Sequence, residues 1–115
     1  MRYVDHEPGA WFLVDQAGIL YLDARYSYSA LIDDSALVRL DRSELEAYRA
    51  GGHSALSELA ARIHHSAPYR EDSPYFSRNV FRGPDGSAYR EAVAAAIADR
   101  TWAAEQRRRD AGEVG

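Results

Sequence analysis

Two adjacent histidines, His64 and His65, are the residues of this sequence that most resemble a ligand pair for a metal ion. They fall near the end of a segment with helical periodicity, and neighbouring residues of a helix point about 100° apart. No third ligand follows at a spacing typical of zinc sites or of a His-Glu-x-x-His motif. The pair therefore favours a structural role, with one ring partly buried and the other in solvent. Neither a metal site nor a cofactor is predicted.

Aspartates are the second group with chemical potential, because paired carboxylates in different environments can divide acid and base roles. Asp33 and Asp34 are adjacent, Asp23 precedes them in a strand-like stretch, and Asp41 follows at the start of a helical one. The sequence does not define the distances between these carboxyl groups. In the alternative interpretation, Asp33 and Asp34 belong to a turn and Asp41 caps a helix. No phosphate loop, dinucleotide fingerprint or Gly-x-Ser-x-Gly motif is present, and no catalytic residue is predicted.

Aromatic and arginine side chains gather in segment 75–82, which reads Tyr-Phe-Ser-Arg-Asn-Val-Phe-Arg. Aromatic residues and Arg are enriched at protein interfaces, and they also stack on bases or hold phosphate groups. In the alternative, the rings close one end of the core and the arginines pair with acidic neighbours. The candidate partner-binding residues, taken from the aspartates and this segment, are Asp23, Asp33, Asp34, Tyr75, Phe76, Arg78, Asn79 and Arg82.

Segment 41–66 is the element that must position these groups, since its apolar residues recur three or four apart, as on one face of a helix. Asp41 is suited to the N-cap and Glu44 to the reciprocal contact of a capping box. The pair Gly51-Gly52 interrupts the segment. Because the apolar stripe keeps its phase across the pair, we expect one continuous or kinked helix, with Gly52 where a strand approaches closely. The alternative is a first helix that ends at the glycines and a second that follows.

Strand patterns precede this helix. Residues 10–14 are a short apolar run, and residues 19–28 alternate between apolar and polar side chains, which predicts a sheet with one buried face. The turn expected at 15–18 makes these two strands an antiparallel hairpin. Residues 36–40 add a further strand that leads directly into the helix. This order predicts a meander of three to four strands.

The remaining segments complete the predicted fold. Residues 1–9 are expected to be an irregular lead-in, and residues 67–86 an ordered loop rich in proline and aromatic side chains. Residues 87–108 favour a C-terminal helix, and residues 110–115 are expected to fray. The fold class is therefore α+β, with one domain over 1–115. An antiparallel three- to four-stranded meander is covered by a long central helix and the C-terminal helix.

Composition narrows the classes of function. The chain of 115 residues has a net charge of −4, no cysteine and 14 basic residues, all of them Arg. The lack of cysteine excludes disulfides and thiolate metal sites and fits the cytoplasm, and Arg in place of Lys is typical of a GC-rich bacterial genome. Neither a signal peptide nor a membrane span is predicted. Residues 1–50 hold nine acidic and five basic side chains, an excess that argues against a nucleic-acid ligand.

These features favour a bacterial cytosolic domain that binds another protein without catalysis. Short acidic α+β domains of this length are similar to many toxin-immunity proteins. The leading hypothesis is an immunity protein whose cognate toxin has a basic surface. An alternative from another class is a small enzyme or ligand-binding domain with its pocket under the loop 67–86. An acidic secretion chaperone is a further alternative, and a homodimer is compatible with each of these.

Overall fold

The structure, a computed structural model, describes the backbone of residues 1–114 and the side chains of residues 1–110. Strands β1 (Arg2–Glu7), β2 (Trp11–Gln16), β3 (Ile19–Ser29) and β4 (Ile32–Arg39) form one antiparallel sheet in chain order. Helices α1 (Arg42–Gly51) and α2 (His53–His65), the short 3-10 helix η1 (Val80–Arg82) and helix α3 (Gly86–Val114) follow. The fold is α+β, and the predicted meander has four strands. Among the described residues, no helix combines the length and hydropathy needed to cross a bilayer.

The first residues form a strand, so the prediction of an irregular lead-in over 1–9 was wrong. β1 pairs antiparallel with β2 from Arg2 opposite Asp15 to Glu7 opposite Trp11, with a bulge between Tyr3 and Asp5. An edge strand is stabilised by hydrogen bonds to the strand beside it, more than by its own residue types. A bulge also interrupts the alternation of its side chains between the two faces of the sheet. For both reasons the alternation of residue types does not reveal β1.

The hairpin between β2 and β3 is tighter than the predicted turn 15–18. Asp15 pairs with Leu20 as part of β2, and the turn itself consists of Ala17 and Gly18, with φ angles of 54° and 84°. Two positive φ angles characterise the two-residue turns that match the twist of a hairpin. The Asp15 carboxylate accepts a hydrogen bond from the Gly18 N–H at 3.1 Å, so Asp15 stabilises the turn from within the strand.

β4 begins earlier than predicted and includes the adjacent aspartates. Asp33 lies opposite Ser27 and Asp34 opposite Tyr26, so these aspartates form part of the β3–β4 ladder. The interpretation of the pair as a turn was therefore wrong. Aspartate is unfavourable in strands, but pairing with the far half of the long strand β3 outweighs this local preference.

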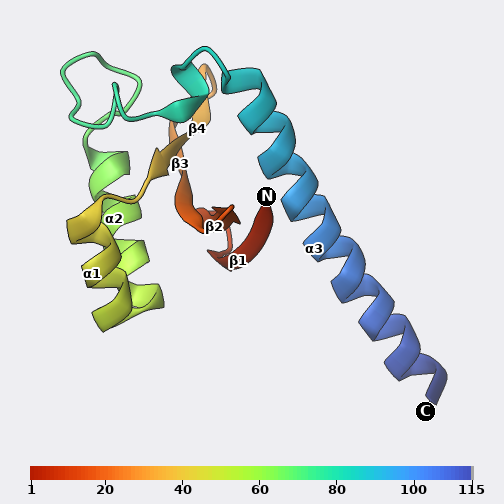
Figure 1. Cartoon of the computed structure of the whole chain (residues 1–115). Helices are drawn as coiled ribbons and strands as arrows, with labels where there is room; N and C mark the ends of the chain where they lie inside the picture. The colour runs from red at the N-terminus through yellow and green to blue at the C-terminus, as the bar shows by residue number, and fades with distance from the viewer. Residues whose placement is uncertain (115) are drawn as a thin grey trace.

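Both faces of the sheet are covered, although the alternation along β3 predicted only one buried face. Figure 1 shows the sheet between α2 on one side and α3 on the other. The larger core, against α2, contains Trp11, Leu13, Leu22, Ala24, Tyr26, Ala36, Val38, Leu40, Leu56, Leu59, Ala60 and Ile63. The smaller core, against α3, contains Val14, Tyr21, Leu37, Val93 and Ala96. Asp23, on the second face of β3, is consequently drawn into a partly buried environment, whereas Arg25 stays exposed.

The predicted central helix is two helices, which break at Gly52. Gly52 has φ 60° and ψ −136°, a conformation that is open almost only to glycine. A Cβ at this position would meet no atom within 4 Å, so Gly52 makes a turn and not a close approach to a strand. The start of α1 is as predicted: Asp41 and Glu44 form a capping box with two hydrogen bonds of 2.8 Å.

Only the second of the two helices lies directly on the sheet. α2 buries Leu56, Leu59, Ala60 and Ile63, whereas α1 buries no side chain completely and packs beside α2 (Figure 1). The apolar residues Leu45 and Tyr48 of α1 are therefore only partly buried against the larger core. The covering layer is a helical hairpin in place of one long rod.

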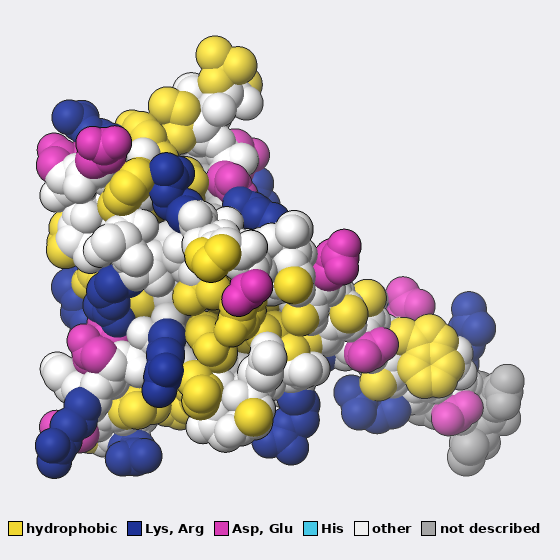
Figure 2. Space-filling view, turned by 45° about the horizontal axis from the view of Figure 1, so that its top comes forward, with side chains coloured by type: hydrophobic (Ala, Val, Ile, Leu, Met, Phe, Trp, Pro, Cys, Tyr) yellow, Lys and Arg dark blue, Asp and Glu magenta, His cyan; other side chains and the backbone are white. Residues whose placement is uncertain are grey.

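Helix α3 is longer than predicted and extends beyond the sheet. Its inner face is the predicted one, and of its residues Val93 and Ala96 are buried. The helix continues to Val114, where we expected an end near Arg108, and its C-terminal part projects from the body as an arm with charges of both signs (Figure 2). This arm raises the radius of gyration to 15.4 Å, against about 13 Å for a compact chain of this length. Fraying of 110–115 stays a prediction, and Gly115 lies outside the described residues.

Candidate functional site

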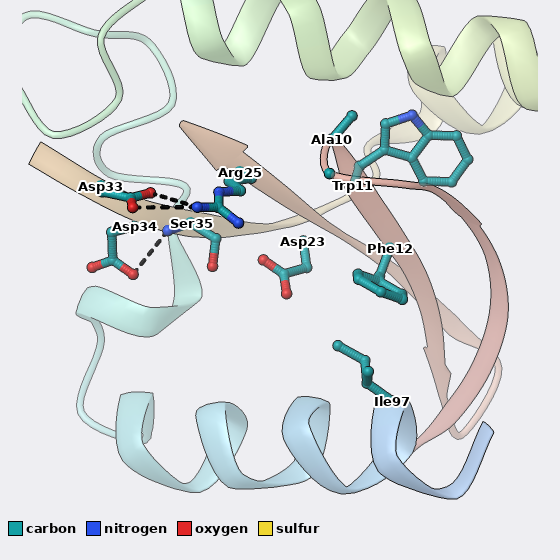
Figure 3. A pocket seen from close by; sticks show the side chains of 10 residues that line it. Ala10, Trp11, Phe12, Asp23, Arg25, Asp33, Asp34, Ser35 and Ile97 are labelled. Atoms are coloured by element: carbon teal, nitrogen blue, oxygen red, sulfur yellow. Dashed lines mark hydrogen bonds and ion pairs between the residues drawn. The ribbon is translucent and has the colours of Figure 1, made fainter. Parts of the chain in front are cut away.

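A hollow of about 430 Å³ opens between the sheet and α3, and the three predicted aspartates meet there (Figure 3). Its walls include Phe12 from β2, Asp23 and Arg25 from β3, Asp33, Asp34 and Ser35 from β4, and Ile97 from α3. We call this feature the acidic hollow. The aspartates were candidates by their residue type alone, and the structure brings them together.

Strand register places Asp23, Arg25 and Asp33 on one face of the sheet. Asp34 alternates to the opposite face and reaches the hollow from the edge strand β4, where it pairs with Arg90. Phe12 of β2 lies opposite Asp23 of β3, and Arg25 lies opposite Ser35 of β4. Side chains two residues apart share one face of a strand, so Asp23 and Arg25 both face α3. Ile97 closes the hollow from the helix side (Figure 3).

Two arginines neutralise the two aspartates of β4. Arg25 donates to both carboxylate oxygens of Asp33 at 3.1 and 3.2 Å. Arg90 of α3 donates to both oxygens of Asp34 at 3.2 and 3.3 Å. These side chains are about half exposed, and such ion pairs contribute little to stability. Their effect is that Asp33 and Asp34 carry little unbalanced charge into the hollow.

Asp23 differs from its neighbours because part of its carboxyl group is buried without a partner. Its Oδ1 atom is inaccessible to solvent and accepts no hydrogen bond among the described residues. Burial raises the pKa of Asp23 above the ordinary value for aspartate, while Ser35 and Arg90 act in the opposite direction. A buried polar atom without a partner costs about 1–3 kcal/mol. Asp23 also lines the hollow, so a cationic group bound there would stabilise the charged form of its carboxyl group.

Arg78, predicted as a partner-binding residue, is engaged within the chain. Its guanidinium group donates to Glu44 of α1 at 3.1 Å and to the backbone carbonyl oxygen of Arg39 at 3.0 Å. The hydrogen bond to Glu44 and the nearby carboxylates raise the pKa of Arg78 above its ordinary value, against the effect of burial. Arg78 thus connects the loop after α2 to the junction between β4 and α1.

Asn79 is buried and has an equally structural position. Its side-chain oxygen accepts hydrogen bonds from the backbone N–H groups of Leu37 at 3.0 Å and Phe81 at 3.1 Å. The same residue forms an isolated antiparallel bridge with Val38 of β4. Asn79 therefore joins η1 to the sheet, and its side chain is not available at the surface.

The remaining loop candidates lie apart from the acidic hollow. Tyr75 is partly buried and packs against the larger core. The Arg82 guanidinium carbon lies 3.9 Å from the ring centroid of the half-buried Phe76, which is a cation–π contact. The structure thus separates the loop residues from the three aspartates. Partner binding by Phe76 and Arg82 stays a prediction.

The histidines do not form a metal site among the described residues. His64 is half-buried and stacks on Tyr28 with a centroid distance of 4.8 Å and an interplanar angle of 3°, whereas His65 is exposed. The prediction that one ring is partly buried and the other in solvent is therefore confirmed.

The role of His53 was not predicted from the sequence. Its Nδ1 lies 2.8 Å from Asp5 Oδ2, and its Nε2 lies 2.7 Å from Glu7 Oε2. Only a protonated imidazole can donate at both nitrogens. Hydrogen bonds to Asp5 and Glu7 accordingly raise the pKa of His53 above its ordinary value of 6.5. These contacts connect β1 to the start of α2, and they were not visible in the sequence because β1 itself was not predicted.

We expect the His53 contacts to make the stability of the chain depend on pH. Because the folded state raises the pKa of His53, its contribution is complete below about pH 6.5 and is lost as the pH rises through the raised pKa. NMR titration of the ring should give a pKa above 6.5. His53→Gln should reduce the loss of stability between about pH 6 and pH 9, and the exposed His65→Gln should not. Equal pH dependence in both variants would contradict this expectation.

Comparisons with protein-family models, with curated proteins and with solved structures gave no match to this chain. A function can therefore be inferred only from the geometry and charge of the site.

Proposed function

We propose that this chain is a protein-binding domain that acts without catalysis, and that its partner places a basic side chain in the acidic hollow. The observation that carries this proposal is the buried, unpartnered oxygen of Asp23. The other charges of the hollow are matched, since Arg25 pairs with Asp33 and Arg90 with Asp34. A lysine or arginine from a partner would both donate to Asp23 and balance its charge.

The particular role that we propose is that of an immunity protein, which neutralises a cognate toxin with a basic surface, such as a nuclease. The hollow lies in the half of the chain with the acidic excess, where nine acidic side chains face five basic ones. Such an excess attracts a basic surface before contact and accelerates association. An acidic chaperone for a basic secreted protein would use the same chemistry and is the alternative within this class. Both roles belong to the bacterial cytoplasm.

Co-expression with the product of the neighbouring gene tests this proposal. We expect that product to be toxic alone, and we expect this chain to protect the cell and to bind the toxin. Asp23→Ala should weaken binding by at least about tenfold, or about 1.4 kcal/mol. Asp72→Ala is the matched control, because Asp72 is 73% exposed and forms an ion pair with Arg70 of the same loop. The proposal would be contradicted if the product of the neighbouring gene were not toxic. It would also be contradicted if Asp23→Ala bound that product as tightly as the native chain does.

A second candidate function is a small enzyme or ligand-binding domain that uses the same hollow. It is favoured by the raised pKa of Asp23, because carboxyl groups with such a pKa in a cavity are typical of general acids and bases. The pocket predicted under the loop 67–86 is less suitable, since Arg78 and Asn79 are engaged within the chain. Saturable binding of arginine amide, lost in Asp23→Ala, would favour a small cationic ligand over a protein.

A further inference from the structure

A second hollow, of about 490 Å³, lies between β1 and the C-terminal part of α3. Arg2 and Tyr3 line it from the strand, and Asp99, Arg100 and Arg107 line it from the helix. A shallower hollow continues it along the same face of α3. We call this surface the arginine groove. It shares no lining residue with the acidic hollow, so a ligand bound here would not depend on the proposed function of that site.

Within the described part of the chain, positive charge exceeds negative charge in the arginine groove. Arg2, Arg100 and Arg107 take part in no ion pair among the described side chains, whereas both arginines around the acidic hollow are paired. Asp99 is the single acidic side chain of the groove among the described residues. The groove therefore offers three guanidinium groups against one carboxylate.

The environment of Arg100 suggests how the groove is organised. This side chain is half-buried, and its guanidinium carbon lies 5.3 Å from the ring centroid of Tyr3. A cation–π contact fixes the orientation of the guanidinium group, but it does not neutralise its positive charge as a carboxylate would. Its N–H groups stay available for a carboxylate or a phosphate, which guanidinium groups can bind with two hydrogen bonds.

The spacing of the arginines limits the size of the ligand. Arg100 and Arg107 are seven residues apart on α3, which is close to two helical turns, so they lie on one face about 10 Å apart along the axis. A ligand with two acidic groups can contact each arginine at its own position along the helix. In an extended peptide, side chains on one face recur about every 7 Å, so acidic groups two or four residues apart bracket this separation. The groove thus fits a chain with repeated acidic groups.

The neighbouring strand favours a peptide over a nucleic acid as that chain. β1 is an edge strand of the sheet, so the outer N–H and C=O groups at its start lie next to the groove. An extended peptide can pair with such groups, and the phosphate backbone of a nucleic acid cannot do so in the same way. Nucleic-acid affinity also depends on the neutralisation of many phosphates, which three arginines in a chain of net charge −4 do not provide.

We propose that the arginine groove binds an extended acidic peptide segment of a partner protein. The test is fluorescence anisotropy at low salt with a labelled decapeptide of alternating glutamate and serine. The double variant Arg100→Gln with Arg107→Gln should bind at least about tenfold more weakly. The control is Arg49→Gln with Arg62→Gln, which removes two exposed arginines of α1 and α2 and should change affinity by less than about twofold.

Circular dichroism must show that both double variants are folded before their affinities are compared. Equal affinities of the groove and control variants, or no binding of the decapeptide at all, would overturn the proposal. A single-stranded DNA decamer that binds the native chain as tightly as the peptide would overturn the assignment to a peptide. Asp23→Asn should leave peptide binding unchanged, which separates this surface from the acidic hollow.

Discussion

Replacement of Asn79 by alanine is expected to lower the free energy of unfolding by about 2–4 kcal/mol. The side-chain oxygen of Asn79 accepts from two backbone N–H groups, those of Leu37 in β4 and Phe81 in η1. Alanine leaves both donors without a partner, and a buried donor in this state costs about 1–3 kcal/mol. Urea denaturation at neutral pH, followed by circular dichroism, measures the loss.

Two further variants determine whether this loss comes from the hydrogen bonds. Asn79→Asp keeps an oxygen that can accept from both N–H groups, so it should lose less stability than Asn79→Ala. Ser77→Ala changes an exposed side chain two residues away and should have almost no effect. Equal stability of the Asn79→Ala and Ser77→Ala proteins would contradict the anchoring role. The predicted loss of stability would show that Asn79 stabilises the fold. Replacement of a residue that only contacts a partner would leave the stability of the free chain unchanged.

Local sequence patterns predicted most helices and strands of this fold, but they did not predict where α1 ends and α2 begins. The capping box of Asp41 and Glu44 and the inner face of α3 were visible because each depends on residues within a few positions of one another. Periodicity describes which face a residue occupies and contains no information on its φ angle. The apolar stripe across Gly51-Gly52 was therefore compatible with one helix, although Gly52 adopts a conformation that ends α1.

The acidic hollow was predictable only in part. Asp23, Asp33 and Asp34 were chosen for their residue type. Strand register places Asp23 and Asp33 on one face, and Asp34 reaches the hollow at the sheet edge through its pair with Arg90. Alternation along β3 placed Asp23 on a face expected to be in solvent. That face is covered because α3 crosses it and contributes Arg90, which is 56 positions from Asp34. The carboxyl oxygen of Asp23 is buried only when α3 packs on the sheet, so no local sequence pattern could predict its burial.

Asp23→Asn is expected to make the chain more stable at neutral pH by about 1 kcal/mol or more. A neutral amide loses less hydration than a carboxylate when it is buried. Burial raises the folded-state pKa of Asp23 above 3.8, so between the unfolded and folded pKa values the folded state binds more protons. The stability of the native chain consequently falls as the pH rises through this interval. The asparagine variant lacks this fall.

Urea denaturation at about pH 3 and pH 7 tests this sign, since the advantage of Asp23→Asn should be present at the higher pH and small at the lower one. Asp72→Asn, which changes a 73% exposed carboxylate, is the control and should show no comparable gain. A variant less stable than the native chain at neutral pH would mean that the charged carboxyl group stabilises the fold. A gain in stability together with a loss of partner binding would instead indicate that Asp23 is kept for function, because sites selected for binding commonly reduce stability.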